Sequence, residues 1–197
     1  FTTLESEILD LALVLHADGG GAVAVARAAG AAIIEILTDQ RHLAARFSDV
    51  YGGFAAVTRA SARAFLAREG EAWDLILVES HGTQLPAMAS LTEDRWLTVQ
   101  GLQAMLWRLA PGGVLAFNRA LDMPPNDILR LLNTAWQALG VEAPQRHTAA
   151  LRGWDALLLV VSREPLGDAA RGRLRGFADR MRFDLVQMEG LDGSEAN

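Results

Sequence analysis

The sequence contains no cysteine and no lysine. The lack of cysteine excludes disulfide bonds, thiolate metal sites and cysteine nucleophiles, and it agrees with a reducing compartment such as the cytoplasm. The lack of lysine makes arginine the carrier of all 18 basic charges and excludes lysine chemistry. Apolar runs such as residues 156–161 are too short to cross a bilayer, and the start does not look like a signal peptide. We therefore expect a soluble, cytoplasmic chain.

Positive charge is also sparse. The 18 arginines stand against 24 acidic residues, which gives a net charge of −6, and they are spread along the sequence rather than gathered in a stripe. This distribution argues against nucleic acid as a partner. At 197 residues we expect one domain over residues 1–189 and a flexible polar tail over 190–197. The start at Phe1 rather than at methionine suggests a piece of a longer protein.

Short runs rich in Val, Ile and Leu alternate with stretches of helical periodicity. This alternation predicts an α/β fold with a mostly parallel sheet and helices on both faces. The predicted strands cover residues 11–15, 32–37, 55–58, 74–79, 113–118, 156–162 and 184–188. The predicted helices cover residues 21–29, 41–50, 60–68, 98–109, 125–139 and 168–182.

A glycine cluster joins the first predicted strand to the first helix in the stretch LALVLHADGGG. Ligands of parallel sheets bind at the carboxyl ends of the strands, and glycines let the backbone approach them closely. Free amides at a helix start also favour a carboxylate or phosphate. The candidate binding residues of this turn are His16, Asp18, Gly19 and Gly20. The alternative is a turn that only packs a helix tightly on a strand.

An acidic residue belongs to the second predicted strand. Glu35 lies 15 residues beyond Gly20, close to the spacing at which a carboxylate accepts hydrogen bonds from the hydroxyls of a ribose. Thr38 and Asp39 are competitors for this role. The structural alternative is a solvated charge at the end of a strand.

The fourth predicted strand ends in DLILVESHGTQ and brings two proton-transferring groups, Glu79 and His81, to the edge of the sheet. The alternative is a structural carboxylate and a surface histidine. A Ser-His-acid triad is not supported, because neighbouring residues of one turn seldom point at a common atom and no G-x-S-x-G turn is present. We also expect no metal site, because no ligand spacing links the four histidines, His16, His42, His81 and His147.

Longer patterns run in order through nearly the whole chain. VTRASARAFLAREGEAWDLILVES is similar to the segment gDaRxFL…yDlIxxD, and LTEDRWLTVQGLQAMLWRLAPGGVLAF to LyTxeFyxxlxxxLxpGGvl. Together with LALVLHADGGG, AAIIEIL and the closing ALLLVVSREP and FADRMRFDLVQ, they resemble the spermidine synthase-like (polyamine aminopropyltransferase-like) branch of the class I S-adenosylmethionine-dependent methyltransferase superfamily. The resemblance implies a Rossmann-like, seven-stranded sheet whose antiparallel last strand lies between the fifth and sixth strands.

The resemblance also implies a cofactor, S-adenosylmethionine or its decarboxylated form, and a set of residues around it. The first-motif and second-strand residues of the family correspond to Asp18, Gly19, Gly20 and Glu35, with His16 in place of the opening glycine. The adenine-contacting aspartate corresponds to Ser61, followed by Ala62. The aspartate that helps to deprotonate the attacking amine corresponds to Glu79, with His81 as a second candidate for the proton.

Three functions follow as hypotheses. The first is transfer of a methyl or aminopropyl group to a small acceptor such as an amine, by a homodimer with a partly degenerate cofactor site. The second is a non-catalytic domain that has lost the cofactor and serves binding, regulation or assembly in a larger protein, since some relatives of this branch carry membrane-spanning segments ahead of the domain. The third, nicotinamide-dependent oxidoreduction, shares only the glycine turn and the acidic residue.

Overall fold

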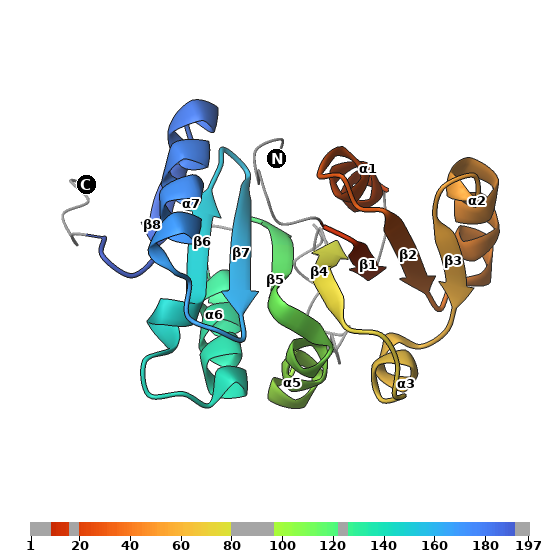
Figure 1. The fold of residues 1–197 in the computed structure, drawn as a ribbon, viewed down its shortest axis with the longest axis horizontal. Coiled ribbons are helices and arrows are strands. Elements are labelled where there is room, and N and C mark those ends of the chain that lie inside the picture. Colours follow the sequence, from red (N-terminus) through yellow and green to blue (C-terminus); the bar gives the residue numbers. More distant parts are fainter. Residues whose placement is uncertain (1–8, 16–19, 80–96, 122–125, 192–197) are drawn as a thin grey trace.

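One mixed sheet of eight strands runs through the computed structural model, which describes residues 9–15, 20–79, 97–121 and 126–191. The order across the sheet is β3-β2-β1-β4-β5-β7-β6-β8 (Figure 1). The strands are β1 (Leu11–Leu15), β2 (Ile33–Thr38), β3 (Ala56–Arg59), β4 (Trp73–Glu79), β5 (Leu109–Ala120), β6 (Thr148–Arg152), β7 (Ala156–Ser162) and β8 (Asp184–Gln187).

Helices cover both faces of this sheet. They are α1 (Gly21–Ala28), α2 (Arg41–Tyr51), α3 (Ala62–Leu66), α5 (Val99–Trp107), α6 (Asn126–Leu139) and α7 (Asp168–Met181), with a 3-10 helix η1 (Pro144–His147) before β6. Figure 1 shows α1, α2 and α7 on one face and α3, α5 and α6 on the other. The central strands are buried on both sides and therefore read as continuous apolar runs.

Strand β1 shows how the two cores are divided. Ala12 and Val14 pack with Val23 of α1 and Phe47 of α2, whereas Leu13 faces the core that α3, α5 and α6 cover. Because side chains alternate along a strand, each β1 residue is committed to one core or the other.

The expected α/β class with a mostly parallel sheet is confirmed, but the strand count is eight rather than seven. Strands β1 to β5 pair in parallel, β7 is antiparallel to both β5 and β6, and β8 is antiparallel to β6. The missed strand is β6, whose sequence TAALR is short and follows directly on η1.

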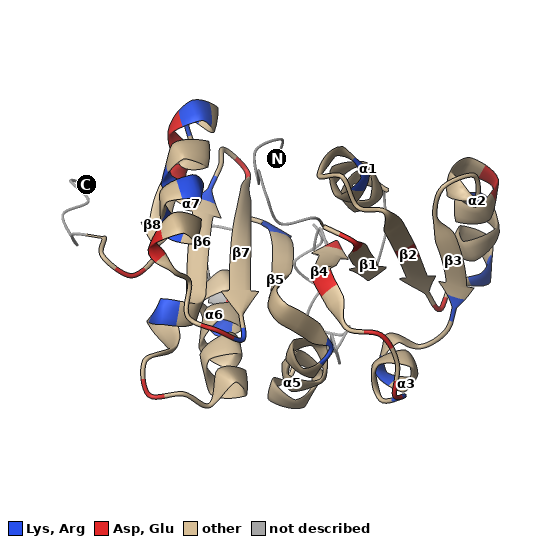
Figure 2. Ribbon diagram, viewed as in Figure 1, with Lys and Arg blue, Asp and Glu red and all other residues tan. Residues whose placement is uncertain are grey.

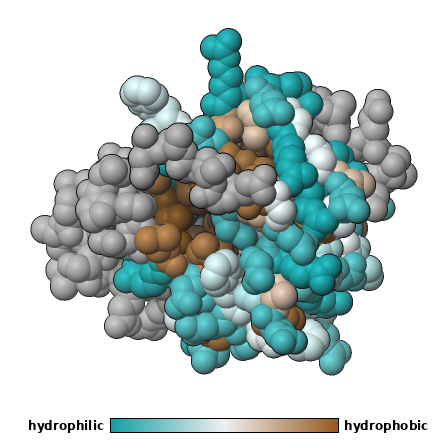
Figure 3. Space-filling view, turned by 90° about the vertical axis from the view of Figure 1, so that its left-hand side faces the viewer, coloured by the Kyte–Doolittle hydropathy of each residue, from teal (hydrophilic) through white to brown (hydrophobic). Residues whose placement is uncertain are grey.

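The predicted position of the last strand in the sheet was also wrong. The antiparallel strand between the fifth and sixth is β7, the predicted strand over residues 156–162, and the final strand β8 lies at the outer edge. At that end of the molecule Figure 3 shows a mainly hydrophilic surface with one group of apolar side chains. Polar side chains are a common protection of an exposed edge strand.

Charge and hydrophobicity have simple distributions in the described residues. Arginines are spread over helices of both faces (Figure 2). Within the described ranges, no helix combines the length and the apolar character needed to cross a membrane.

Candidate active site

The carboxyl ends of the first four strands meet at one edge of the sheet, which we call the carboxyl edge. Backbone pairing places Leu15 of β1 level with Leu37 of β2 and with Val78 of β4. Thr38 and Glu79 therefore each lie one residue beyond this line. Sequence segments that are far apart along the chain thus meet where ligands of such sheets bind.

Glu79, the last residue of β4, is the most informative side chain at this edge. It is only 5% exposed. Its Oε1 accepts a hydrogen bond from the backbone N–H of Ala22 at 3.3 Å, in the first turn of α1. Its Oε2 is buried and has no hydrogen-bonding partner among the described residues. The helix start favours the negative charge, and one carboxylate oxygen still lacks a partner that burial makes necessary.

The glycines of the first turn allow this close packing. Gly20 precedes α1 with a φ of 77°, in the left-handed region that side chains with a Cβ avoid. A Cβ on Gly20 would lie 2.1 Å from the hydroxyl oxygen of Tyr51, and one on Gly21 would lie 2.9 Å from Oε1 of Glu79. Gly20 and Gly21 are therefore required by close packing against Tyr51 and Glu79.

Tyr51 is a residue that sequence reasoning missed. It is the last residue of α2 and packs between Phe47 and Phe54, with ring centroids 5.9 and 5.8 Å away. Helix side chains lean toward the helix start, which brings the phenol back along α2 to Gly20. The only available signal was that the chain has a single tyrosine, and no motif attaches a role to it.

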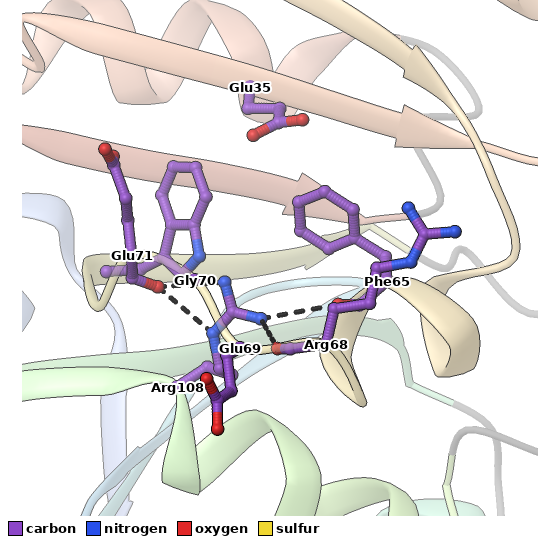
Figure 4. A pocket seen from close by; sticks show the side chains of 8 residues that line it. Glu35, Phe65, Arg68, Glu69, Gly70, Glu71 and Arg108 are labelled. Carbon is purple, nitrogen blue, oxygen red and sulfur yellow. Dashed lines mark hydrogen bonds between the residues drawn. The ribbon is translucent and has the colours of Figure 1, made fainter.

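The second strand does not bring Glu35 to the carboxyl edge. Glu35 lies three residues before the end of β2, opposite Leu13, and it lines a cavity with Phe65 that is described below (Figure 4). The residues at the edge are the two competitors, Thr38 and Asp39. Thr38 is buried and its hydroxyl accepts a hydrogen bond from the N–H of Gln40 at 3.2 Å, whereas Asp39 is exposed.

Ser61 and Ala62, which the resemblance predicts to lie near an adenine, follow β3: Ser61 precedes α3 and Ala62 is its first residue. Ser61 is exposed at the position before α3, and its side chain makes no capping hydrogen bond. Ala62 is buried. The N–H of Ala60 bonds to the carbonyl of Thr38 at 3.1 Å, so this segment adjoins the end of β2.

Four of the predicted site residues, His16, Asp18, Gly19 and His81, lie outside the described residues. Among the residues that are described, no three acidic or histidine side chains are grouped closely enough to hold a metal ion. Of the described candidates, Glu79 contacts the start of α1, which Gly20 precedes, while Asp39 follows β2 and Ser61 precedes α3.

Solved structures that superpose on this chain identify its fold. A probable spermidine synthase from Corynebacterium glutamicum superposes with a TM-score of 0.60 and 15% identity, over 98% of this chain and 77% of that one. Human methyltransferase-like protein 13, solved in complex with S-adenosylhomocysteine, gives a TM-score of 0.57 and 15% identity over 96% and 87%. The chain has the class I methyltransferase fold.

A third structure with this fold is the N-methyltransferase NodS from Bradyrhizobium japonicum WM9, with a TM-score of 0.52 and 16% identity over 81% of this chain and 89% of that one. No protein family model matches the sequence, and no curated protein matches it. The methyltransferase fold and the likeness to a spermidine synthase, both predicted from the motifs, are confirmed at the level of the fold.

Proposed function

We propose that this chain is an S-adenosylmethionine-dependent transferase that moves a methyl or aminopropyl group to a small acceptor such as an amine. The observation that carries the proposal is the buried carboxylate of Glu79 at the carboxyl edge, held by the start of α1 and with one oxygen unpartnered among the described residues. The fold supports it, because two of the methyltransferase structures were solved with S-adenosylhomocysteine.

The residues at this edge suit such a cofactor. A sulfonium or ammonium group is positively charged and would supply the partner that Oε2 of Glu79 lacks. Asp39 follows β2, where a carboxylate can accept hydrogen bonds from ribose hydroxyls. Ser61, with its side chain exposed and uncommitted to a cap, is the candidate for the adenine.

The chemistry requires a proton acceptor, and Glu79 has that role in the proposal. When bound, the cofactor supplies a carbon whose bond to positively charged sulfur breaks as the lone pair of the acceptor attacks it, which leaves a neutral thioether. The carboxylate of Glu79 takes the proton that the amine loses. The hydrogen bond from Ala22 fixes the direction of this carboxylate, and such positioning contributes much of the rate in group transfer.

Finer expectations belong to the same proposal. The likeness to a spermidine synthase favours the decarboxylated form of the cofactor, an amine acceptor, a homodimer and a cytoplasmic location. They rest on the resemblance, whereas the role of Glu79 rests on geometry.

The proposal is tested by a product assay. The protein is incubated with S-adenosylmethionine or its decarboxylated form and a panel of amines, and mass spectrometry detects S-adenosylhomocysteine or methylthioadenosine. We expect Glu79→Gln to reduce product formation by at least about 100-fold, the lower range for loss of a general base. The control is Glu142→Gln, an exposed carboxylate, which should leave the rate unchanged.

Two outcomes contradict the proposal. Equal rates for the wild type and Glu79→Gln would remove Glu79 from the mechanism. A folded protein that binds a cofactor but forms no product with any amine would favour the non-catalytic alternative.

A further inference from the structure

A cavity of about 200 Å³ lies at the opposite end of β4 from the candidate active site. We call it the amino-edge pocket and define it by Glu35, Phe65, Glu69, Glu71, Trp73 and Arg108. Trp73 begins β4 and Glu79 ends it, which places about 20 Å of strand between the two sites. A ligand in this pocket would therefore not occupy the carboxyl edge.

Glu35 is unusual in its surroundings. It is half-buried in the middle of β2, on the face where the neighbouring Leu13 and Leu37 are fully buried core residues. It has no hydrogen bond or ion pair with any described residue. Figure 4 shows its carboxylate pointing toward the ring of Phe65. This carboxylate can therefore pair with a cation or a hydrogen-bond donor that enters the pocket.

Arg108 does not supply that partner, because its four hydrogen bonds all run to backbone carbonyls and none to Glu35. Its Nη1 donates to the carbonyls of Phe65 and Arg68 at 3.3 and 3.0 Å, and its Nε and Nη2 donate to the carbonyl of Glu71 at 3.0 and 2.9 Å. Figure 4 shows these bonds on the side of the pocket away from Glu35. Arg108 therefore holds the pocket wall in place.

The remaining charges of the lining favour a cation. Glu35, Glu69 and Glu71 stand against Arg68 and Arg108, a balance of 3 − 2 = 1 net negative charge. Arg108 keeps its positive charge when it bonds to neutral backbone carbonyls, so the net charge of the lining is −1 with Arg108 included.

Aromatic side chains complete the lining. Phe65 and Trp73 both border the pocket, and the faces of aromatic rings attract cations: the guanidinium carbon of Arg108 lies 5.7 Å from the centroid of the Phe65 ring. Trp73 is 3% exposed, and its Nε1 is buried without an acceptor among the described residues. The ammonium group of a ligand would pair with Glu35, and an oxygen of the same ligand would accept a hydrogen bond from Nε1 of Trp73.

We propose that the amino-edge pocket is a second binding site, which takes a small organic ammonium cation with Glu35 as its counter-ion and Phe65 and Trp73 as its aromatic walls. The volume sets an upper limit on the ligand, because drug-sized molecules occupy pockets of about 300–1,000 Å³. The site is independent of the proposed transferase function and needs no cofactor.

The test is a titration of the cofactor-free protein followed by nuclear magnetic resonance of the tryptophan indole N–H groups. The signal of Trp73 is assigned by its loss in Trp73→Phe. The ligands are ethanolamine and, separately, tetramethylammonium, with ethylene glycol as the neutral analogue of ethanolamine and sodium chloride as the control for ionic strength. We expect a saturable shift of the Trp73 signal with the ammonium ligands and none with the two controls.

Variants show whether Glu35 is responsible. Glu35→Gln should weaken binding at least tenfold, whereas Glu142→Gln should bind like the wild type. If Glu35→Gln does not fold, Glu35→Asp replaces it under the same criterion, because the shorter side chain withdraws the charge from the rings. The proposal is overturned by the absence of a saturable Trp73 shift, by equal binding of ethylene glycol, or by unchanged affinity in the Glu35 variant.

Discussion

Gly20 is the residue on which the start of α1 depends. Its positive φ and its contact with the hydroxyl of Tyr51 are two separate constraints, because the first concerns the backbone and the second concerns space. Gly30, which follows α1, has a φ of 89° but would place a Cβ in open space. Comparing alanine substitutions at the two glycines therefore separates the cost of backbone strain from the cost of steric clash.

The first residue-scale prediction uses this pair. Gly20→Ala should lower the free energy of unfolding by about 2–4 kcal/mol, since left-handed strain and overpacking add. Gly30→Ala should lower the free energy of unfolding by only about 1–2 kcal/mol, because backbone strain is its only cost. Adding Tyr51→Phe should recover part of the loss in Gly20→Ala and none in Gly30→Ala. Urea denaturation measures all four variants, and equal losses for the two glycines would show that Tyr51 does not constrain the turn.

In Glu79, the two oxygens of one carboxylate differ in their surroundings. Its burial and its bond to Ala22 serve the fold by satisfying the start of α1, while its second oxygen serves no described residue. A purely structural carboxylate would be expected to have both oxygens satisfied. This asymmetry is the physical reason for proposing that Glu79 takes part in the chemistry.

At the scale of elements, Arg108 ties the connection between α3 and β4 to the end of α5. Its guanidinium group bonds to three backbone carbonyls, and its own carbonyl accepts a hydrogen bond from the N–H of Trp73 at 2.8 Å. The start of β4 and the wall of the amino-edge pocket are thus held by one side chain.

We predict that Arg108→Met lowers the free energy of unfolding by about 2–3 kcal/mol, because it keeps the aliphatic stem but leaves the carbonyls without their charged donor. The matched control is Arg130→Met on α6, whose ion pair with Asp127 is largely exposed and should be worth less than about 1 kcal/mol. Chemical denaturation compares the two, and a loss at Arg108 no greater than at Arg130 would contradict the assigned role.

The elements differ in how well the sequence predicts them. The apolar runs of β1, β4 and β7 are visible because burial on both faces makes these strands mainly apolar. Strand β6 was missed because its five residues include two alanines, which are depleted in strands, and form a strand only through pairing with β7, which follows after a short connection, and with β8. Pairing of this kind leaves little trace in a short local pattern.

The site residues, like the strands, were predicted correctly where the signal is local and were missed or misplaced where distant contacts decide. The prediction that Glu79 ends a strand was correct, because a charged residue directly after an apolar run is a local signal. Glu35 was placed at the carboxyl edge by its spacing from the glycines, yet the register puts Asp39 there. Register is decided by the whole sheet, and a shift along a strand changes which residues reach the edge. Tyr51 was missed because its contact with Gly20 spans two helices.

At the scale of the whole molecule, the sheet has two ends with different properties. At the carboxyl edge Glu79 contacts the start of α1, whereas the amino-edge pocket combines Glu35 with aromatic rings. Likeness to the three solved structures extends over 81–98% of the chain, so both ends belong to one fold. The central claim concerns the carboxyl edge.

Isothermal titration calorimetry tests that claim most directly. The protein is titrated with S-adenosylmethionine, decarboxylated S-adenosylmethionine and the neutral methylthioadenosine, and the titrations are repeated with Glu79→Gln. We predict micromolar binding of at least one sulfonium ligand, tighter than that of methylthioadenosine, and a smaller preference in Glu79→Gln because the carboxylate no longer attracts the positive charge. No binding of any of the three by the folded protein, or a preference that Glu79→Gln leaves unchanged, would contradict the account.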